Sequence, residues 1–125
     1  MIVGLGIDVI EVARLAAALR RHGDHFLERV FTESEQAASA TRADRVLALA
    51  ARFAAKEACL KALGTGWAEG LGFRDVEIVR EGNRPPRLVF HGEAARRAEA
   101  LGVVRSHLSL THQPGLAAAV VVLEG

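Results

Sequence analysis

The chain has 125 residues, of which 50% are hydrophobic and 25% are charged, with a formal net charge of +1 at pH 7. This length predicts one domain over residues 1–125. The balanced charge argues against a nucleic-acid-binding or membrane-surface protein, and no apolar run approaches the roughly 20 residues that cross a bilayer. The opening residues lack the pattern of a secretory signal, so we expect a cytoplasmic protein.

The first half of the chain is predicted to contain one strand and three helices. They are expected at 2–7 (strand), about 11–22 (helix), 32–39 (short helix) and about 41–64 (long helix). Apolar residues at helical spacing support the helices. Thr32 and Glu35 have the spacing of a capping box, and Gly23 and Gly64 are expected to end the first and the long helix.

The second half of the chain is richer in strand-like segments. The expected elements are strands at 74–81 and 87–91 joined by a turn at 82–86, a helix at 93–102, and strands at 107–110 and 117–123. Helices that cluster first and strands that follow predict an α+β fold. We expect a mostly antiparallel sheet packed with one long helix and shorter helices.

The basic residues are strongly biased toward arginine. Of 16 basic residues, 14 are Arg, and only Lys56 and Lys61 are Lys. In such a chain, Lys is expected to remain where a compact ammonium fits better than a guanidinium fork, notably beside phosphates in tight sites. The single Cys59 has no partner for an internal disulfide and is expected to be a small core residue.

Asp8 follows the first predicted strand. Alternate residues of a strand share a face, so Gly4, Gly6 and Asp8 are expected to point the same way. The two glycines leave that face bare beside the carboxylate, where another backbone, a metal or a ligand can approach closely. The alternative is that Asp8 caps the helix that follows.

Glu57 lies on the apolar side of the long predicted helix. At helical spacing, Val46, Phe53 and Leu60 lie close to it around the axis. A buried carboxylate without a partner is costly or takes up a proton, so we expect a cationic group to meet Glu57. The alternative is an ion pair with Lys61 at i+4, which contributes only about 0.2–0.5 kcal/mol.

Lys61 and the Gly64-Thr65-Gly66 segment close the same helix. Small residues at a helix end let a ligand approach the backbone, and Lys offers positive charge to a phosphate. Asp8 and Glu57 are oxygen ligands without a His or Cys cluster, which favours magnesium over zinc. Together these residues predict a magnesium site for a phosphorylated substrate.

Two segments resemble a known family. GIDVIEVARL at 6–15 and RFAAKEACLKALGTG at 52–66 are similar, in order and separation, to both signatures of the holo-acyl-carrier-protein synthases, which are 4'-phosphopantetheinyl transferases. PPRLVFHGEA at 85–94 and HLSLTH at 107–112 fit as well, so the resemblance covers nearly the whole chain. It implies the 4'-phosphopantetheinyl transferase fold.

The resemblance implies an enzyme of fatty acid biosynthesis. It would transfer 4'-phosphopantetheine from coenzyme A to a serine of apo acyl carrier protein and release adenosine 3',5'-bisphosphate. Asp8 and Glu57 would bind magnesium at the pyrophosphate and act with Lys61 as catalytic residues. The serine proton would go to Glu57 or to a water molecule at the metal, and the sequence leaves both open. Larger relatives place a second acid where this chain has Ile10.

The resemblance also implies the residues that contact each substrate. Coenzyme A is expected to contact Lys61, Gly64, Thr65, Gly66, Pro86 and His112. The alternatives are a turn former for Pro86 and a loop residue for His112. Arg14 and Arg21, which share a face of the first predicted helix, are expected to contact the acidic carrier, and the alternative is a solvated helix face. Relatives of this length are typically trimers with active sites between subunits, so we expect a homotrimer.

Two other functions stay open from the sequence alone. A magnesium-dependent enzyme acting on another phosphorylated small molecule would share Asp8 and Glu57 but would not need the arginine face. A non-catalytic binding module would use Asp8 as a helix cap and pair Glu57 with Lys61.

Overall fold

The structure is a computed structural model that describes residues 1–65 and 70–125. The elements of this part of the chain are, in order, β1 (Ile2–Glu11), α1 (Val12–His22), α2 (Asp24–Val30), α3 (Glu33–Ala40), α4 (Arg45–Leu63), a 3₁₀ turn (Phe73–Asp75), β2 (Val76–Val79), β3 (Arg87–Phe90), α5 (Gly92–Ala100), β4 (Arg105–Gln113) and β5 (Leu116–Glu124). The strand pairs of these residues are antiparallel, which confirms the predicted α+β class. None of their helices is long and apolar enough to cross a membrane.

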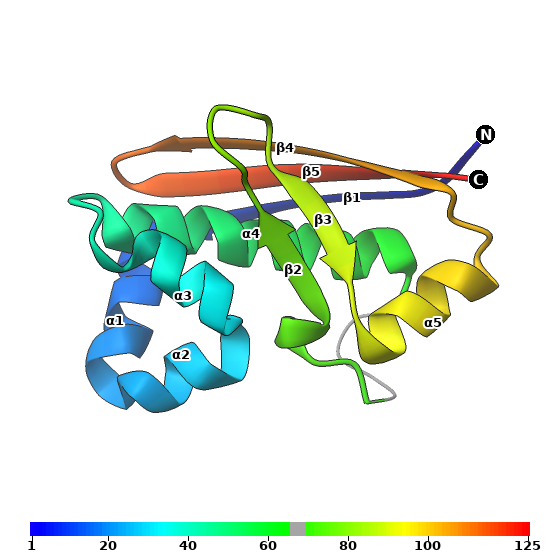
Figure 1. Ribbon diagram of the computed structural model, residues 1–125. Coiled ribbons are helices and arrows are strands. Elements are labelled where there is room, and N and C mark those ends of the chain that lie inside the picture. Colours follow the sequence, from blue (N-terminus) through cyan, green and yellow to red (C-terminus); the bar gives the residue numbers. More distant parts are fainter. Residues whose placement is uncertain (66–69) are drawn as a thin grey trace.

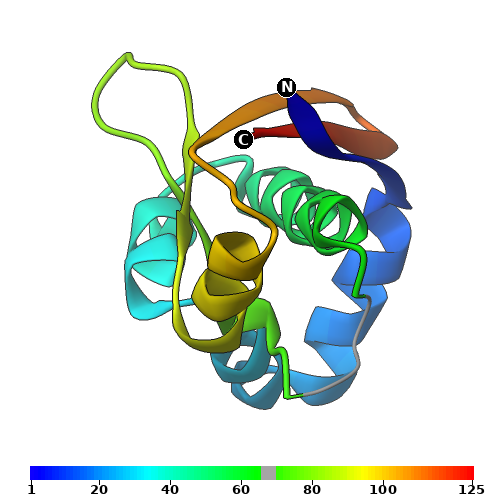
Figure 2. The same cartoon turned by 90° about the vertical axis from the view of Figure 1, so that its right-hand side faces the viewer.

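The long helix α4 lies at the centre of the molecule. A three-stranded sheet in the order β1-β5-β4 covers one side of it, and β2 and β3 form a separate pair (Figure 1). Seen from its end, α4 has the sheet on one side, with the shorter helices and the β2–β3 pair around the others (Figure 2). Thirteen of its 19 residues are buried, and many of these are alanines that let neighbours approach closely.

Strand β1 lies directly against α4 because two glycines remove the side chains between them. A Cβ added to Gly6 would lie 1.8 Å from the carbonyl oxygen of Ala58, and one added to Gly4 would lie 2.2 Å from that of Ala62. The bare face predicted for this strand therefore meets a backbone. This contact fixes the position of Asp8 relative to the last turns of α4.

Several element boundaries differ from the predicted ones. β1 continues to Glu11, so Asp8 lies inside a strand and the alternative of a helix cap is wrong; Glu11 is the N-cap residue of α1. The short helix α2 was not predicted. It begins directly after Gly23, and the glycine was interpreted only as the end of the first helix. The capping box of Thr32 and Glu35 and the left-handed end of α4 at Gly64, with φ of 75°, are both confirmed.

The outer face of the three-stranded sheet is apolar and exposed in the single chain. Leu5, Ile7 and Val9 point away from α4, and their exposed fractions are 65%, 63% and 59%. Next to them, β5 contributes Val120 and Val122 to the same face. By contrast, Cys59 is fully buried under the inner face, as predicted, and burial raises the pKa of its thiol to about 12.

Candidate active site

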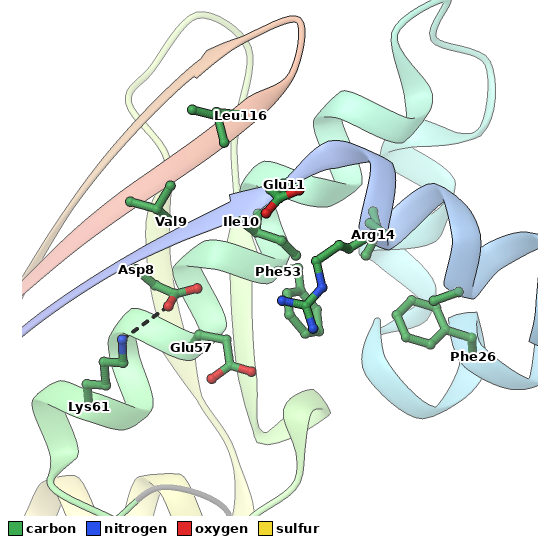
Figure 3. Close-up of a pocket in the computed structure, with 12 residues that line it drawn as sticks. Asp8, Val9, Ile10, Glu11, Arg14, Phe26, Phe53, Glu57, Lys61 and Leu116 are labelled. Carbon is green, nitrogen blue, oxygen red and sulfur yellow. Dashed lines mark hydrogen bonds and ion pairs between the residues drawn. The ribbon is translucent and has the colours of Figure 1, made fainter.

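A cavity of about 710 Å³ opens between the end of β1, the helices α1 and α2, and the middle of α4. Its charged lining consists of Asp8, Glu11, Arg14, Glu57 and Lys61. Figure 3 shows these side chains converging on one space from β1, α1 and α4. The structure therefore brings together residues that are up to 53 positions apart in the sequence.

Asp8 and Lys61 form an ion pair at one end of this pocket. The Nζ atom of Lys61 lies 3.1 Å from Oδ1 of Asp8 and also donates to the carbonyl oxygen of Ile7 at 3.0 Å. The Asp8 side chain is only 19% exposed, whereas that of Lys61 is 55% exposed. Among the described residues, two of the three N–H donors of Lys61 are thus used, and the ammonium still faces the pocket.

The Glu57 carboxylate shares this end of the pocket but has no cationic partner among the described residues. In the described part of the chain it makes no hydrogen bond or ion pair, so the alternative of an ion pair with Lys61 is wrong. Burial raises the pKa of Glu57, and the negative charge of Asp8 raises it further, while Lys61 lowers it. The five charged side chains of the pocket are three carboxylates and two cations, so negative charge is in excess.

These donors fit a hard divalent cation. The described residues contain no group of three or more His, Cys, Asp and Glu side chains that could enclose a metal. Asp8 and Glu57 offer oxygen atoms only and would leave several coordination positions for water or phosphate oxygens, which is the arrangement that magnesium favours. Ile10, which by the resemblance stands where larger relatives have a second acid, packs against the core and offers no side-chain oxygen.

The other end of the pocket is apolar. Phe53 and Phe26 line it, together with Leu15 and Ala18 of α1. Figure 3 shows the Arg14 side chain extending over Phe53, between this apolar wall and Glu57. The sequence placed Phe53 on the apolar stripe of α4 beside Glu57 but did not identify it, or Phe26, as a pocket residue. Its spacing of four residues from Glu57 was the available signal.

Of the three residues predicted to contact a ligand at the end of α4, the structure describes Gly64 and Thr65. Gly64 ends the helix, and the buried Oγ1 of Thr65 has no hydrogen-bond partner among the described residues. Gly66 lies outside the described residues.

Three other predicted residues lie away from this pocket in the single chain. His112 lines a second cavity of about 270 Å³ at the turn between β4 and β5. Pro86 lies in the loop between β2 and β3 and lines neither cavity. Arg21 is exposed in the last turn of α1, so of the two predicted carrier-binding arginines only Arg14 reaches the pocket.

Comparison with known proteins identifies close relatives over the full length. The sequence profile of the 4'-phosphopantetheinyl transferase superfamily matches residues 4–121. A holo-[acyl-carrier-protein] synthase of Koribacter versatilis is 48% identical over 124 residues, which cover 99% of each chain.

Solved structures also match this fold over nearly the whole chain. The holo-[acyl-carrier-protein] synthase of Neisseria meningitidis matches with a TM-score of 0.91 at 31% identity and covers 100% of both chains. The corresponding enzyme of Helicobacter pylori, crystallised in complex with coenzyme A, matches with a TM-score of 0.84 at 31% identity. That match covers 96% of this chain and 99% of the other.

Proposed function

This chain belongs to the 4'-phosphopantetheinyl transferase superfamily, among its holo-acyl-carrier-protein synthases, and from that premise we propose how its pocket works. It transfers 4'-phosphopantetheine from coenzyme A to a serine of an apo acyl carrier protein, with magnesium held by Asp8 and Glu57. We assign the reaction to fatty acid biosynthesis in the cytoplasm. Membership of an enzyme family contradicts the alternative of a non-catalytic module.

One observation carries the metal assignment. Asp8 and Glu57 face one space, and the pKa of Glu57 is raised by burial and by the charge of Asp8. Such a pair lacks positive charge, because Lys61 forms its ion pair with Asp8 alone among the described residues. A bound magnesium ion would supply that charge and screen the carboxylates from the diphosphate of coenzyme A.

Lys61 and Arg14 supply the remaining positive charge. The exposed ammonium of Lys61 can turn its remaining donor toward a phosphate oxygen while Asp8 holds its position. The carrier serine forms the new P–O bond at the β-phosphorus, and the bond to the departing adenosine 3',5'-bisphosphate breaks. Positive side chains fixed beside these oxygens stabilise the negative charge that develops there.

The arginine on α1 supports an acidic protein partner. Arg14 lines the pocket near Glu57, at the point where a serine would have to enter. Arg21 lies on the same helix, exposed and outside the pocket, where it can contact a larger partner. Complementary charge would mainly speed the encounter with the carrier.

We propose that the enzyme works as a homotrimer. The exposed apolar face at Leu5, Ile7 and Val9 is the kind of surface that a neighbouring subunit covers. Pro86 and His112, expected to contact coenzyme A, lie outside the pocket of their own chain. A neighbour that supplies these two residues would complete the site.

A transfer assay tests the proposed reaction directly. The purified protein is incubated with coenzyme A, magnesium and an apo acyl carrier protein, and the carrier is weighed by mass spectrometry. We expect a gain of one phosphopantetheine that is lost when magnesium is chelated. A carrier that gains no mass, beside an active control enzyme, would contradict the proposal.

A further inference from the structure

Lys56 is a fully buried charge that the proposed reaction does not use. Its side chain is 0% exposed, although it neighbours Glu57 in the sequence. The Nζ atom lies 2.8 Å from Oε1 of Glu35, 3.0 Å from the carbonyl oxygen of Phe73 and 2.5 Å from that of Val76. Three acceptors around one atom match the three donors of an ammonium. A guanidinium fork would spread its donors over a wider area, which explains a Lys in this Arg-rich chain.

Glu35, the partner of Lys56, is itself held by two other elements. Its Oε1 accepts from the backbone N–H of Thr32 at 2.8 Å, and its Oε2 accepts from that of Ile78 at 2.9 Å. The carboxylate therefore connects the start of α3 and the strand β2 to α4. The buried ion pair is fully hydrogen-bonded, which is the condition for such a pair to hold one defined geometry.

The ammonium of Lys56 also holds the two residues at the ends of a row of aromatic rings. It donates to the backbone carbonyl oxygen of Phe73 and lies 5.7 Å from the centroid of the Phe31 ring. Between these two residues the row continues through Phe53 and Phe26. The ring centroids of Phe73 and Phe53 are 5.2 Å apart, and those of Phe53 and Phe26 are 6.4 Å apart. The Phe26 centroid lies 6.3 Å from that of Phe31. Lys56 therefore holds the backbone of the residue at one end of this row and the ring at the other end.

Two rings of this row belong to the apolar wall of the pocket. Phe26 and Phe53 line the cavity beside Arg14, whereas the other two rings support them from behind. We propose that Lys56 is a positioning residue that fixes this wall through Phe73 and Phe31. It acts on substrate through Phe26 and Phe53, without touching it.

The substrate that this wall serves is the carrier protein, an inference that rests on the proposed function. In an in-line displacement the attacking hydroxyl enters opposite the leaving group. Asp8, Glu57 and Lys61 occupy the phosphate end of the pocket, so the serine enters from the end that holds Arg14 and the apolar wall. Apolar side chains beside the carrier serine would then rest on Phe26 and Phe53.

The test removes the buried charge without leaving its partner alone. Lys56→Met combined with Glu35→Gln takes out both charges, and Lys56→Arg keeps a cation but changes its geometry. We expect both variants to raise the KM for apo carrier about tenfold or more, since small displacements of a binding wall have effects of this size. The KM for coenzyme A should stay within about twofold. The affinity of both variants for a carrier whose serine is replaced by Ala, measured by titration calorimetry, should fall together with the rise in the KM for carrier.

A matched control separates positioning from general stability. Leu123→Ala opens the core on the sheet side, away from the aromatic row, and is compared at a temperature below all unfolding transitions. It should leave both KM values unchanged.

Unchanged carrier binding in both Lys56 variants would overturn the proposal, and so would equal rises in both KM values. Full recovery by Lys56→Arg would show that any buried cation suffices, which also contradicts it. If one variant fails to fold, the other decides the question, because each alone predicts the KM difference. Failure of the proposed function would appear differently, as a wild-type enzyme that transfers nothing.

Discussion

At the scale of single residues, Glu57 is a carboxylate in an environment that disfavours its negative charge. It is half-buried beside Asp8 and has no cationic partner of its own among the described residues. Lys56 and Lys61 show two contrasting uses of an ammonium group. One is enclosed by three protein acceptors, and the other keeps part of its donor capacity toward the pocket.

Glu57→Gln removes the charge and preserves the shape of the side chain. We expect magnesium affinity to be lost and kcat/KM to fall at least about 100-fold, because a neutral amide binds a hard cation poorly. The raised pKa means that the folded chain binds the Glu57 proton more tightly than the unfolded chain does. Ionised Glu57 therefore disfavours the metal-free fold above that pKa.

The unfolding temperature in a chelator should accordingly stay the same or rise in Glu57→Gln. Calorimetric metal titration and thermal unfolding measure the two effects. Glu99→Gln, on the exposed side of α5, is the control and should change neither. A variant that binds magnesium normally would exclude Glu57 as a ligand.

At the scale of elements, the site depends on how closely β1 approaches α4. Gly4 and Gly6 allow the strand to rest on the carbonyl groups of Ala62 and Ala58, which sets Asp8 over the turn that carries Glu57. The backbone contact, not a side-chain contact, determines where the two carboxylates meet.

Gly6→Ala should push β1 away from α4. The added Cβ would lie 1.8 Å from a backbone oxygen, so the strand or the helix must move. We expect destabilisation by about 1–3 kcal/mol or more, with a loss of activity as Asp8 shifts. Chemical denaturation and the transfer assay measure these effects. Gly115→Ala, where a Cβ meets nothing within 4 Å, should be nearly neutral, and equal stability of the two variants would contradict the account.

Glu77 connects α3 to β2 and to the end of β3. Its pKa is lowered to about 2, first by the hydrogen bond from Ser34, then by that from Thr32, and also by His91. Because the pKa is lowered on folding, the stabilisation is fully present above the ordinary value of 4.5 and disappears as the pH falls toward 2. Glu77→Gln should cost about 1–3 kcal/mol at neutral pH.

The stability gap between wild type and Glu77→Gln should narrow as the pH falls between these two values. Denaturant unfolding across this range, with both proteins measured at each pH, provides the comparison. A gap that stays constant with pH would show that the Glu77 charge does not act on stability.

The helices and strands of the site could be predicted from the sequence better than the contacts between them. Glycines at 4 and 6 and the apolar neighbours of Glu57 indicated which face of the strand is bare and which face of the helix is buried, because strand and helix periodicity are local properties. The partner of the glycine face, the role of Lys56 and the aromatic row could not be predicted in the same way. They depend on contacts between residues far apart in the chain, such as Lys56 with Phe73. The helix α2 was not predicted because Gly23 indicates the end of a helix, whereas here it is also the N-cap residue of the next one.

At the scale of the whole molecule, the main uncovered feature is the apolar outer face of the three-stranded sheet. One face of the sheet packs on α4, and the other carries Leu5, Ile7 and Val9 into solvent in the single chain. A subunit that covers this face would also lie next to the end of β1, and therefore next to Asp8.

Leu5→Lys should break the proposed trimer. A buried, unpaired ammonium at a subunit contact is costly, so we expect the particle to change from three times the 13.4 kDa chain mass to a single chain, with loss of turnover. Light scattering gives the mass, and far-ultraviolet circular dichroism should show an unchanged fold. Ala38→Lys adds the same charge on exposed α3 and should stay trimeric. A wild-type protein that is monomeric at assay concentration would contradict the trimer.

We propose that Asp8 and Glu57 would together hold one divalent cation beside the diphosphate of coenzyme A. Crystals grown with coenzyme A and manganese, which scatters anomalously and takes the same oxygen ligands as magnesium, test it directly. We expect one anomalous peak in contact with carboxylate oxygens of residues 8 and 57 and with a phosphate oxygen. A peak that touches neither residue, or carboxyl groups too far apart to share an ion, would contradict it.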